Sequence, residues 1–217
     1  MKTESGLRLD LIGICRKLES KGLVAATDGN VSVKVGEERL LVTPSGRAKG
    51  ELTPLDLLLI DLDGEVLAGS GKPSSEIRMH LAVYRKRRDV QAVVHAHPPM
   101  LTAFTLAGLP FLAEALPEVW MSIGPVPTAP YATPSTEEVP RAIAPFIEKH
   151  QAILMERHGS LTVGRTLHEA YMRLEKLEHA ARTLFFAHLL KNGAPSQLPQ
   201  DALSKLVLFR PAFPESV

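Results

Sequence analysis

Three histidines have types and spacing that suit metal chemistry. His95 and His97 stand two residues apart in the alternating segment 90–97, which predicts a β-strand, so both side chains leave the same face. Their imidazoles can therefore reach one metal ion. His158 follows a second predicted strand, residues 152–156, and is the candidate third ligand. Three histidines with an open fourth position are typical of a catalytic zinc site, since structural sites usually take four protein ligands and favour cysteine.

Glu76 is the carboxylate that we expect to accompany these histidines. It stands at the start of a predicted helix, directly after Ser74 and Ser75. Helix capping would by itself explain an acidic residue there, because a carboxylate stabilises the positive end of the helix dipole by about 0.3–1 kcal/mol. Capping would explain the two serines as well. The functional alternative is a site in which hydroxyls and free backbone N–H groups hold a phosphate.

Two other loops offer small residues rich in hydrogen-bond donors, the pairs Gly29-Asn30 and Ser45-Gly46. Each pair alone is typical of a plain turn, so neither by itself indicates a ligand. The other five histidines lie on predicted helices or at their edges, and they have no partner at ligand spacing. We assign no role to these five, which are His80, His150, His168, His179 and His188.

Helices and strands that would position these residues mix along the whole chain. Apolar residues at steps of three and four, together with capping patterns, predict helices over residues 7–21, 74–88, 135–150 and 166–191. Alternating or apolar runs predict strands over residues 31–35, 39–43, 57–61, 65–68, 90–97 and 152–156. The proline-rich segment 110–134 predicts short strands and loops without a long helix. Residues 201–209 predict a last short helix or strand.

The composition predicts one globular domain of the α/β class. The chain has 217 residues, of which 45% are hydrophobic and 23% charged, and it contains neither an internal repeat nor a linker. We therefore predict a single domain over residues 1–217, in which residues 193–217 form a C-terminal tail. The order of the elements favours a mixed, largely antiparallel sheet that helices cover.

Charge and cysteine content exclude several classes of function. Twenty-five basic residues against 24 acidic ones give a formal charge of +1, which argues against a nucleic-acid surface or a polybasic membrane patch. The longest aliphatic run is far shorter than the ~18 residues needed to cross a bilayer. The lone Cys15 cannot form an internal disulfide, and the N-terminus lacks the features of a secretion signal. These observations predict a cytoplasmic protein.

Five short motifs in this order and spacing together resemble the class II aldolase/adducin family. They are Thr27-Asp28-Gly29-Asn30-Val31-Ser32, Val42-Thr43-Pro44-Ser45-Gly46, Pro73-Ser74-Ser75-Glu76, Val94-His95-Ala96-His97 and Arg157-His158-Gly159. The resemblance covers about residues 7–190. It implies a three-layer α/β/α sandwich, assembled as a homotetramer with active sites at the subunit interfaces.

The resemblance also implies the chemistry of the site. One Zn²⁺ per subunit would be bound by His95, His97 and His158, with Glu76 as a fourth ligand at rest that moves away to act as acid and base. Substrate phosphate would lie against Gly29, Asn30, Ser45, Gly46, Ser74 and Ser75. The implied reaction is reversible cleavage of a small phosphorylated ketose to dihydroxyacetone phosphate and an aldehyde, in which zinc stabilises the enediolate.

The chain departs from the aldolases of this family on the aldehyde side of the site. Where they have a tyrosine that handles the aldehyde oxygen, this chain has Trp120, whose indole N–H donates but cannot shuttle a proton. A second family tyrosine belongs to the C-terminal tail, and this chain has none there. Tyr131 lies in a predicted loop and could take over the role, although a packed loop anchor is the alternative.

Other functions therefore stay open on the same residues. A pentulose-5-phosphate 4-epimerase or a methylthioribulose-1-phosphate dehydratase would use the same metal and phosphate sites. A hypothesis from another class is a non-catalytic interaction module like the adducin head, which shares the fold but lacks the metal ligands. A zinc hydrolase, in which Glu76 activates a water molecule, is the fourth alternative.

Overall fold

The computed structural model describes residues 2–209, and these form an eight-stranded sheet. In chain order the strands are β1 (Asn30–Val35), β2 (Arg39–Val42), β3 (Leu58–Asp61), β4 (Val66–Ala68), β5 (Ala92–Ala96), β6 (Thr128–Ala129), β7 (Ala152–Met155) and β8 (Gly159–Gly164). Their order across the sheet is β4-β3-β2-β1-β5-β8-β7-β6. Within the described residues all neighbouring pairs are antiparallel except β6 and β7. The predicted mixed, largely antiparallel sheet is thus confirmed.

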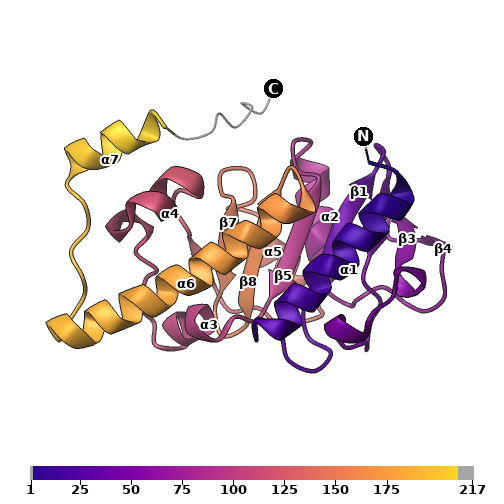
Figure 1. Ribbon diagram of the computed structural model, residues 1–217, viewed down its shortest axis with the longest axis horizontal. Helices are drawn as coiled ribbons and strands as arrows, with labels where there is room; N and C mark the ends of the chain where they lie inside the picture. The colour runs from indigo at the N-terminus through magenta and orange to yellow at the C-terminus, as the bar shows by residue number, and fades with distance from the viewer. Residues whose placement is uncertain (1, 210–217) are drawn as a thin grey trace.

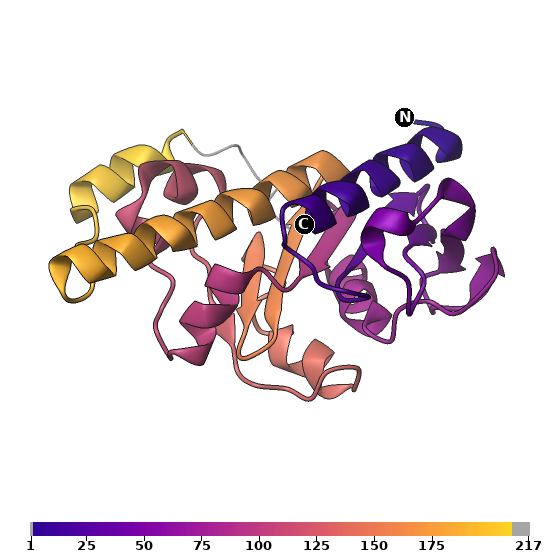
Figure 2. The same cartoon turned by 60° about the horizontal axis from the view of Figure 1, so that its bottom comes forward.

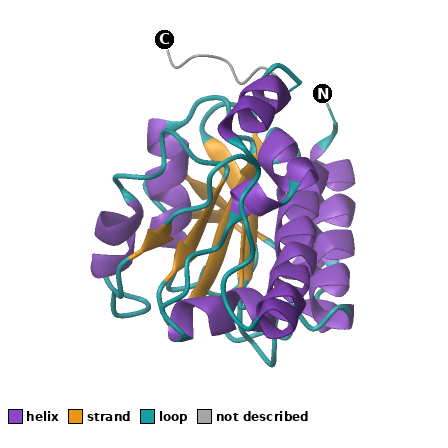
Figure 3. Ribbon diagram, turned by 90° about the vertical axis from the view of Figure 1, so that its left-hand side faces the viewer, coloured by secondary structure: helices purple, strands orange, loops and turns teal. Residues whose placement is uncertain are grey.

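Helices cover both faces of this sheet, which confirms the three-layer α/β/α arrangement (Figure 3). One face packs against α1 (Glu4–Ser20), α3 (Pro99–Leu106), α4 (Pro117–Ser122) and α6 (Leu167–Lys191). The other face packs against α2 (Ile77–Lys86) and α5 (Glu138–Ile143). Short 3₁₀ turns are η1 (Lys49–Glu51), η2 (Pro54–Asp56) and η3 (Ala113–Ala115). In Figure 1, α1 and α6 lie side by side in front of the strands.

The alternation of side chains along the strands divides the interior into two apolar clusters. On β5, Ala92, Val94 and Ala96 belong to the cluster under α1 and α6, whereas Val93 belongs to the cluster under α2 and α5. Because successive residues of a strand face opposite sides of the sheet, His95 points to the α2 side as Val93 does. The apolar pattern of the central strand therefore decides on which side of the sheet the first histidine lies.

The predicted long helix near the C-terminus is confirmed as α6. Its N-cap is Thr166, whose hydroxyl oxygen accepts a hydrogen bond of 3.0 Å from the backbone N–H of Glu169. It ends at Asn192, which adopts the left-handed conformation with φ 53°. Figure 2 shows α6 running along most of the molecule and the chain turning back into α7 (Gln200–Val207). Residues 193–209 of the predicted tail thus contain a helix, and residues 210–217 lie outside the described residues.

One expectation for the middle of the chain was wrong, and one helix there was not predicted. The helix predicted over residues 135–150 spans only Glu138–Ile143, because Ser135 adopts a left-handed φ of 66° and Pro145 cannot continue the hydrogen-bond ladder. The expected capping box at Ser135 is absent, since the Glu138 carboxylate instead accepts from the backbone N–H of Thr133 at 2.8 Å. The prolines that stop β5 also start a helix, α3, which the sequence analysis did not predict.

The strands β1, β2, β5 and β7 lie within or close to their predicted boundaries, whereas β8 was not predicted as a strand. The hairpin of β1 and β2 pairs Ser32 with Val42 and Val35 with Arg39, as the polar turn between them predicts. The segment 110–134 contains α4, η3 and β6 and no long helix, as expected. Among residues 2–209, none of the helices combines the length and the apolar character needed to cross a membrane.

Candidate metal centre

Two antiparallel neighbours, β5 and β8, bring the three histidines to one end of the sheet. Ala96 pairs with Ser160, so His97 lies one residue and His158 two residues beyond the last pair of these strands. The centroids of the three rings are 4.8, 4.9 and 5.0 Å apart, which is close to an equilateral triangle. Each ring therefore faces a common centre from a different direction.

Gly159 allows this close approach of the two strands. A Cβ atom at position 159 would lie 2.4 Å from the carbonyl oxygen of Ala96 and 2.8 Å from Cδ2 of His97. No side chain fits there without moving the backbone of β5. The backbone of Gly159 is not left-handed, so its role is the close packing of His97 against β8 and not a sharp turn.

Glu76 completes the cluster from the N-cap position of α2. Its side chain makes no capping hydrogen bond, so the capping alternative does not describe what the carboxylate does. One carboxylate oxygen lies 3.1 Å from Nε2 of His95 and the other lies 3.0 Å from Nε2 of His158. One ligand atom from each of Glu76, His95, His97 and His158 lies within 4.8 Å of the others. The structure thus brings together all four residues that the sequence predicted as metal ligands.

The tautomer of His95 indicates that this cluster suits a cation, because it leaves acceptor atoms facing one another. The carbonyl oxygen of Ser160 lies 2.9 Å from Nδ1 of His95 and can only accept, so Nδ1 carries a proton and Nε2 of the neutral ring holds a lone pair. That Nε2 atom lies 3.0 Å from Nε2 of His97 and 3.1 Å from the Glu76 carboxylate. The lone pair of His95 and the Glu76 carboxylate are therefore two acceptors at hydrogen-bond distance from each other. A divalent ion would satisfy both of them, and imidazole with carboxylate is a ligand set that zinc accepts.

The ionisation of these groups is consistent with ligand character. Burial disfavours the charged form of Glu76, but the contacts of its two oxygens with the rings of His158 and His95 outweigh burial and hold the pKa of this carboxyl well below its usual range. Burial and the neighbouring rings of His95 and His158 lower the pKa of His97 to about 4. At neutral pH the site thus offers an ionised carboxylate and a neutral imidazole, which are the forms that bind metal.

Asp28 is a residue of the centre to which the sequence analysis gave no role. Its carboxylate lies 3.4 Å from Nδ1 of His97, so that Nε2 of the same ring faces the cluster. A carboxylate or carbonyl group behind a histidine fixes its tautomer and its orientation. Asp28 does this for His97, and the carbonyl of Ser160 does it for His95. The sequence could have indicated Asp28, because it lies within a motif that was already noted, but only the fold shows its partner.

The three donor-rich loops lie next to the metal ligands. The side-chain amide of Asn30 donates to the Ser74 hydroxyl at 3.2 Å and to the Glu76 carboxylate at 3.1 Å. The backbone N–H of Ser45 donates to the carbonyl of Lys72 at 2.9 Å, which places the second loop beside the third. Gly29 has φ 73°, and a Cβ atom there would lie 3.0 Å from the carbonyl oxygen of His95. The first loop therefore packs directly against the end of β5.

The segment 130–137 also lies beside the site, which the sequence did not predict. The hydroxyl oxygens of Ser75 and Ser135 are 2.7 Å apart, and the backbone N–H of Tyr131 donates to the Glu156 carboxylate at 3.1 Å. The Tyr131 side chain is exposed, so the alternative of a packed loop anchor was wrong. Trp120 is directed to α7, where its indole N–H donates to the carbonyl oxygen of Leu203 at 3.3 Å.

The histidines without an assigned role include one that the fold buries completely. Nδ1 of His80 lies 2.6 Å from the hydroxyl of Ser32, and burial lowers the pKa of His80 to about 3. This ring stays neutral and supports the packing of α2 on β1. His150 and His188 hydrogen-bond through Nδ1 to carbonyl oxygens of their own helical segments. The metal centre thus uses three of the eight histidines.

Comparison with known proteins agrees with the family that the sequence motifs resemble. The sequence profile of the class II aldolase and adducin N-terminal domain matches residues 9–185. A 5-deoxy-D-ribulose 1-phosphate aldolase of Bacillus thuringiensis is 34% identical over 201 residues, which cover 92% of each chain. A 3-oxo-tetronate 4-phosphate decarboxylase of Escherichia coli K12 is 35% identical over 188 residues, covering 85% of this chain and 88% of the relative.

A solved structure shares the fold along nearly the whole chain. An L-fuculose 1-phosphate aldolase superposes with a TM-score of 0.85 at 31% sequence identity, covering 96% of this chain and 97% of the other. The fold and the cluster of three histidines and one glutamate are those of a metal-dependent lyase. The chain belongs to the class II aldolase and adducin family, and within it resembles the fuculose-phosphate aldolases.

Proposed function

We propose that this protein is a zinc-dependent class II aldolase that reversibly cleaves a small phosphorylated ketose to dihydroxyacetone phosphate and an aldehyde. The observation that carries the proposal is the surplus of acceptor atoms where His95, His97 and Glu76 meet, next to three donor-rich loops. The carbonyl and hydroxyl oxygens of such a substrate would bind the metal, and its phosphate group would bind the loops.

His95, His97 and His158 would hold the metal, with Glu76 as the fourth ligand. Bound there, a zinc ion would polarise the carbonyl and adjacent hydroxyl oxygens of the ketose and lower the energy of the enediolate. Three neutral imidazoles leave the full charge of the ion available to the substrate. The carbonyl of Ser160 and the carboxylate of Asp28 keep two of these rings in place.

Glu76 is the proposed acid and base. Displaced by the substrate's oxygens, its carboxylate would carry a proton to and from the enediolate carbon, a contribution of about 10²–10⁴-fold in rate. The amide of Asn30, which donates to this carboxylate, would hold it near the reacting carbon. Glu76 is the N-cap residue of α2, and its carboxylate makes no capping hydrogen bond, so the helix itself does not hold the side chain in place.

The substrate phosphate would lie among Gly29, Asn30, Ser45, Gly46, Ser74 and Ser75. Ser45, Gly46 and Ser75 are exposed, whereas Asn30 is buried and hydrogen-bonded to Ser74. This arrangement offers hydroxyl and backbone donors at the surface above a fixed amide. It suits an anion that is recognised by neutral donors without a lysine.

Decarboxylation of a phosphorylated 3-oxo sugar acid is the second candidate. Aldol cleavage must take a proton from the hydroxyl of the departing aldehyde, and an indole cannot accept one. Trp120 moreover directs its N–H to Leu203. Loss of CO₂ needs no such acceptor and leaves the same kind of enediolate, and a decarboxylase is among the relatives. Epimerisation and dehydration would use the same centre.

Product analysis with the zinc-loaded protein separates these reactions. We expect dihydroxyacetone phosphate from 5-deoxyribulose 1-phosphate or fuculose 1-phosphate, with the activity lost in EDTA and restored by Zn²⁺. Release of CO₂ from 3-oxo-tetronate 4-phosphate without aldol cleavage would support the second candidate instead. Turnover that survives complete removal of the metal, or a protein that binds no zinc, would reject both.

We also propose a cytoplasmic homotetramer. Exposed apolar side chains gather on the C-terminal half of α6 and the end of α3, namely Leu106, Leu109, Phe185, Phe186, Leu189 and Leu190. These two segments are adjacent, because the rings of Phe104 and His188 lie 5.9 Å apart. Apolar surface of this kind is typical of contacts between subunits. The location rests on the single cysteine, Cys15, which is buried and unpaired.

A further inference from the structure

Lys49 is a charged side chain that the fold buries almost completely. It is the first residue of η1 and is 1% exposed. Its ammonium group donates to the carbonyl oxygen of Thr27 at 2.8 Å and to that of Arg47 at 2.7 Å. Lysine is rarely buried, because its charge loses hydration, so these two carbonyl dipoles replace part of the lost water.

The two carbonyl groups belong to two of the proposed phosphate loops. Thr27 precedes Asp28, Gly29 and Asn30, and Arg47 directly follows Ser45-Gly46. One ammonium group therefore joins the backbone of the first loop to the backbone of the second. Both hydrogen bonds lie just outside the residues that would meet the phosphate, so Lys49 itself takes no part in direct recognition.

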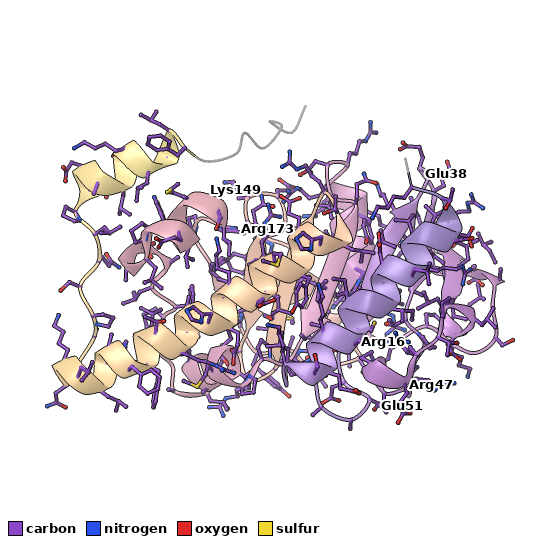
Figure 4. The ribbon with its side chains drawn as sticks, in the orientation of Figure 1. Arg16, Glu38, Arg47, Glu51, Lys149 and Arg173 are labelled. Carbon is purple, nitrogen blue, oxygen red and sulfur yellow. The ribbon has the colours of Figure 1, made fainter. Side chains whose placement is uncertain are left out.

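The turn that carries Lys49 is itself fixed to α1. The Glu19 carboxylate accepts a hydrogen bond of 3.0 Å from the backbone N–H of Gly50. Figure 4 labels Arg47 and Glu51, on either side of Lys49 in the chain, and the turn η1 packs against α1. The lysine thus connects both loops to the helical layer. The loops are held at a distance that the scaffold sets.

The charge of Lys49 is under opposing influences. Burial lowers the pKa of its ammonium group, whereas Cys15, Asp28 and Glu19 raise it. An uncharged side chain of similar length would fill the space but would leave the carbonyls of Thr27 and Arg47 without their donor. A buried carbonyl group without a donor is costly, so each loop would favour conformations in which water reaches its carbonyl oxygen. Loss of either hydrogen bond would therefore leave that loop less constrained.

We propose that Lys49 is a positioning residue that sets the spacing between the Asp28–Asn30 and Ser45–Gly46 loops, and thereby the affinity of the site for a phosphate group. The inference rests on the proposed function, which places the substrate phosphate at these loops. Lys49 acts on the phosphate only through the backbone of the two loops. Neither hydrogen bond goes to His95, His97, His158 or Glu76, so Lys49 is not itself part of the metal site.

The test compares zinc-loaded wild type with Lys49→Met, using glycerol phosphate as the probe and glycerol as its control in titration calorimetry. Residues that orient metal ligands typically contribute about ten- to a hundredfold, and we apply the same factor to a residue that orients the phosphate loops. We expect the dissociation constant for glycerol phosphate to rise by about that factor while zinc content stays the same. For a substrate that the wild type cleaves, KM should rise much more than kcat falls.

Lys34→Met is the matched control. Lys34 is also nearly buried, at 9% exposure, but it lies near the far end of β1 with its ammonium group 5.7 Å from the centre of the Tyr84 ring. This variant loses a similar cation and should keep wild-type affinity for glycerol phosphate. If Lys49→Met does not fold, Lys49→Gln keeps one donor and should show an intermediate loss.

The outcomes separate the inference from the proposed function. Equal affinity in wild type and Lys49→Met would overturn the inference, as would an equal loss in Lys34→Met, which would indicate general loosening of the fold. A wild-type protein that does not distinguish glycerol phosphate from glycerol would instead contradict the proposed phosphate site, and with it the basis of the inference.

Discussion

Two polar clusters lie at opposite ends of β5 and β8, and they differ in how their hydrogen-bonding groups are matched. Arg87, Asp89, Gln151 and Arg173 gather at the end where β5 begins and β8 finishes. Glu76 and the three histidines gather at the other end. Both clusters are largely buried, and both join elements that are far apart in the sequence.

The arginine cluster satisfies its own donors. Arg87 makes two bonds to the Asp89 carboxylate, at 2.7 and 2.6 Å, and a third to the carbonyl of Ile147 at 3.0 Å. Arg173, whose side chain Figure 4 labels on α6, donates to Gln151 at 3.2 Å and also to the carbonyl of Val163. Fork-shaped guanidinium groups suit such paired acceptors. Nothing further is needed to hold this cluster together.

The histidine cluster has more acceptors than its own protons can satisfy. Nε2 of His95 carries a lone pair and faces both a carboxylate and a second imidazole. A buried surplus of lone pairs is costly unless a cation is bound. A buried cluster whose donors and acceptors are paired with one another thus has a structural role. A buried cluster with unpaired acceptors is instead a candidate binding site.

Glu76→Gln should produce the largest effect, and on activity rather than on folding. An amide cannot carry the proton, so turnover should fall by about 10²–10⁴-fold, equivalent to about 2.7–5.5 kcal/mol in the activation barrier. Steady-state kinetics with zinc analysis would measure it, and the zinc content shows whether the metal is still bound. Unchanged turnover in a zinc-loaded variant would rule out the role of this carboxylate.

Arg87→Met should have the converse effect, on folding rather than on activity. Removing one partner of a buried pair leaves Asp89 and the carbonyl of Ile147 without donors, and should lower the free energy of unfolding by about 3–5 kcal/mol. Urea unfolding would measure the loss, while kcat/KM at a temperature where the variant is folded should match the wild type. A large fall in kcat/KM would show that the two ends of the sheet are coupled.

Asp89→Asn should have a smaller effect that depends on pH. Hydrogen bonds from Arg87 hold the pKa of the Asp89 carboxyl below its usual range, although burial opposes them. Stabilisation is therefore complete above about pH 4, near the pKa of an unfolded aspartate, and is lost as pH falls through the lower folded value. At pH 7 the variant should be less stable by about 1.5–3 kcal/mol. Urea unfolding from pH 7 to pH 3 should show the two proteins converging, and a constant difference would contradict this account.

Much of the fold was predictable because its information is local. The Thr166 cap, the Asn192 end and the apolar repeat between them predicted α6, and the alternation around His95 predicted β5 and the shared face of two histidines. Ser135 misled the prediction of a long helix, since its left-handed backbone is imposed by the Ser75 and Arg78 contacts across the site. A local pattern fails where a distant contact decides the backbone.

By itself, the sequence determined which residue types could bind a metal and a phosphate, because strand periodicity and short motifs are properties of neighbouring residues. Tertiary structure alone decided that Glu76 faces His95 and His158 instead of capping α2, that Asp28 stands behind His97, and that Lys49 is buried between two loops. These contacts join segments separated by tens of residues. Their geometry follows from how the strands pair and how the helices pack on them, which spacing along the chain does not encode.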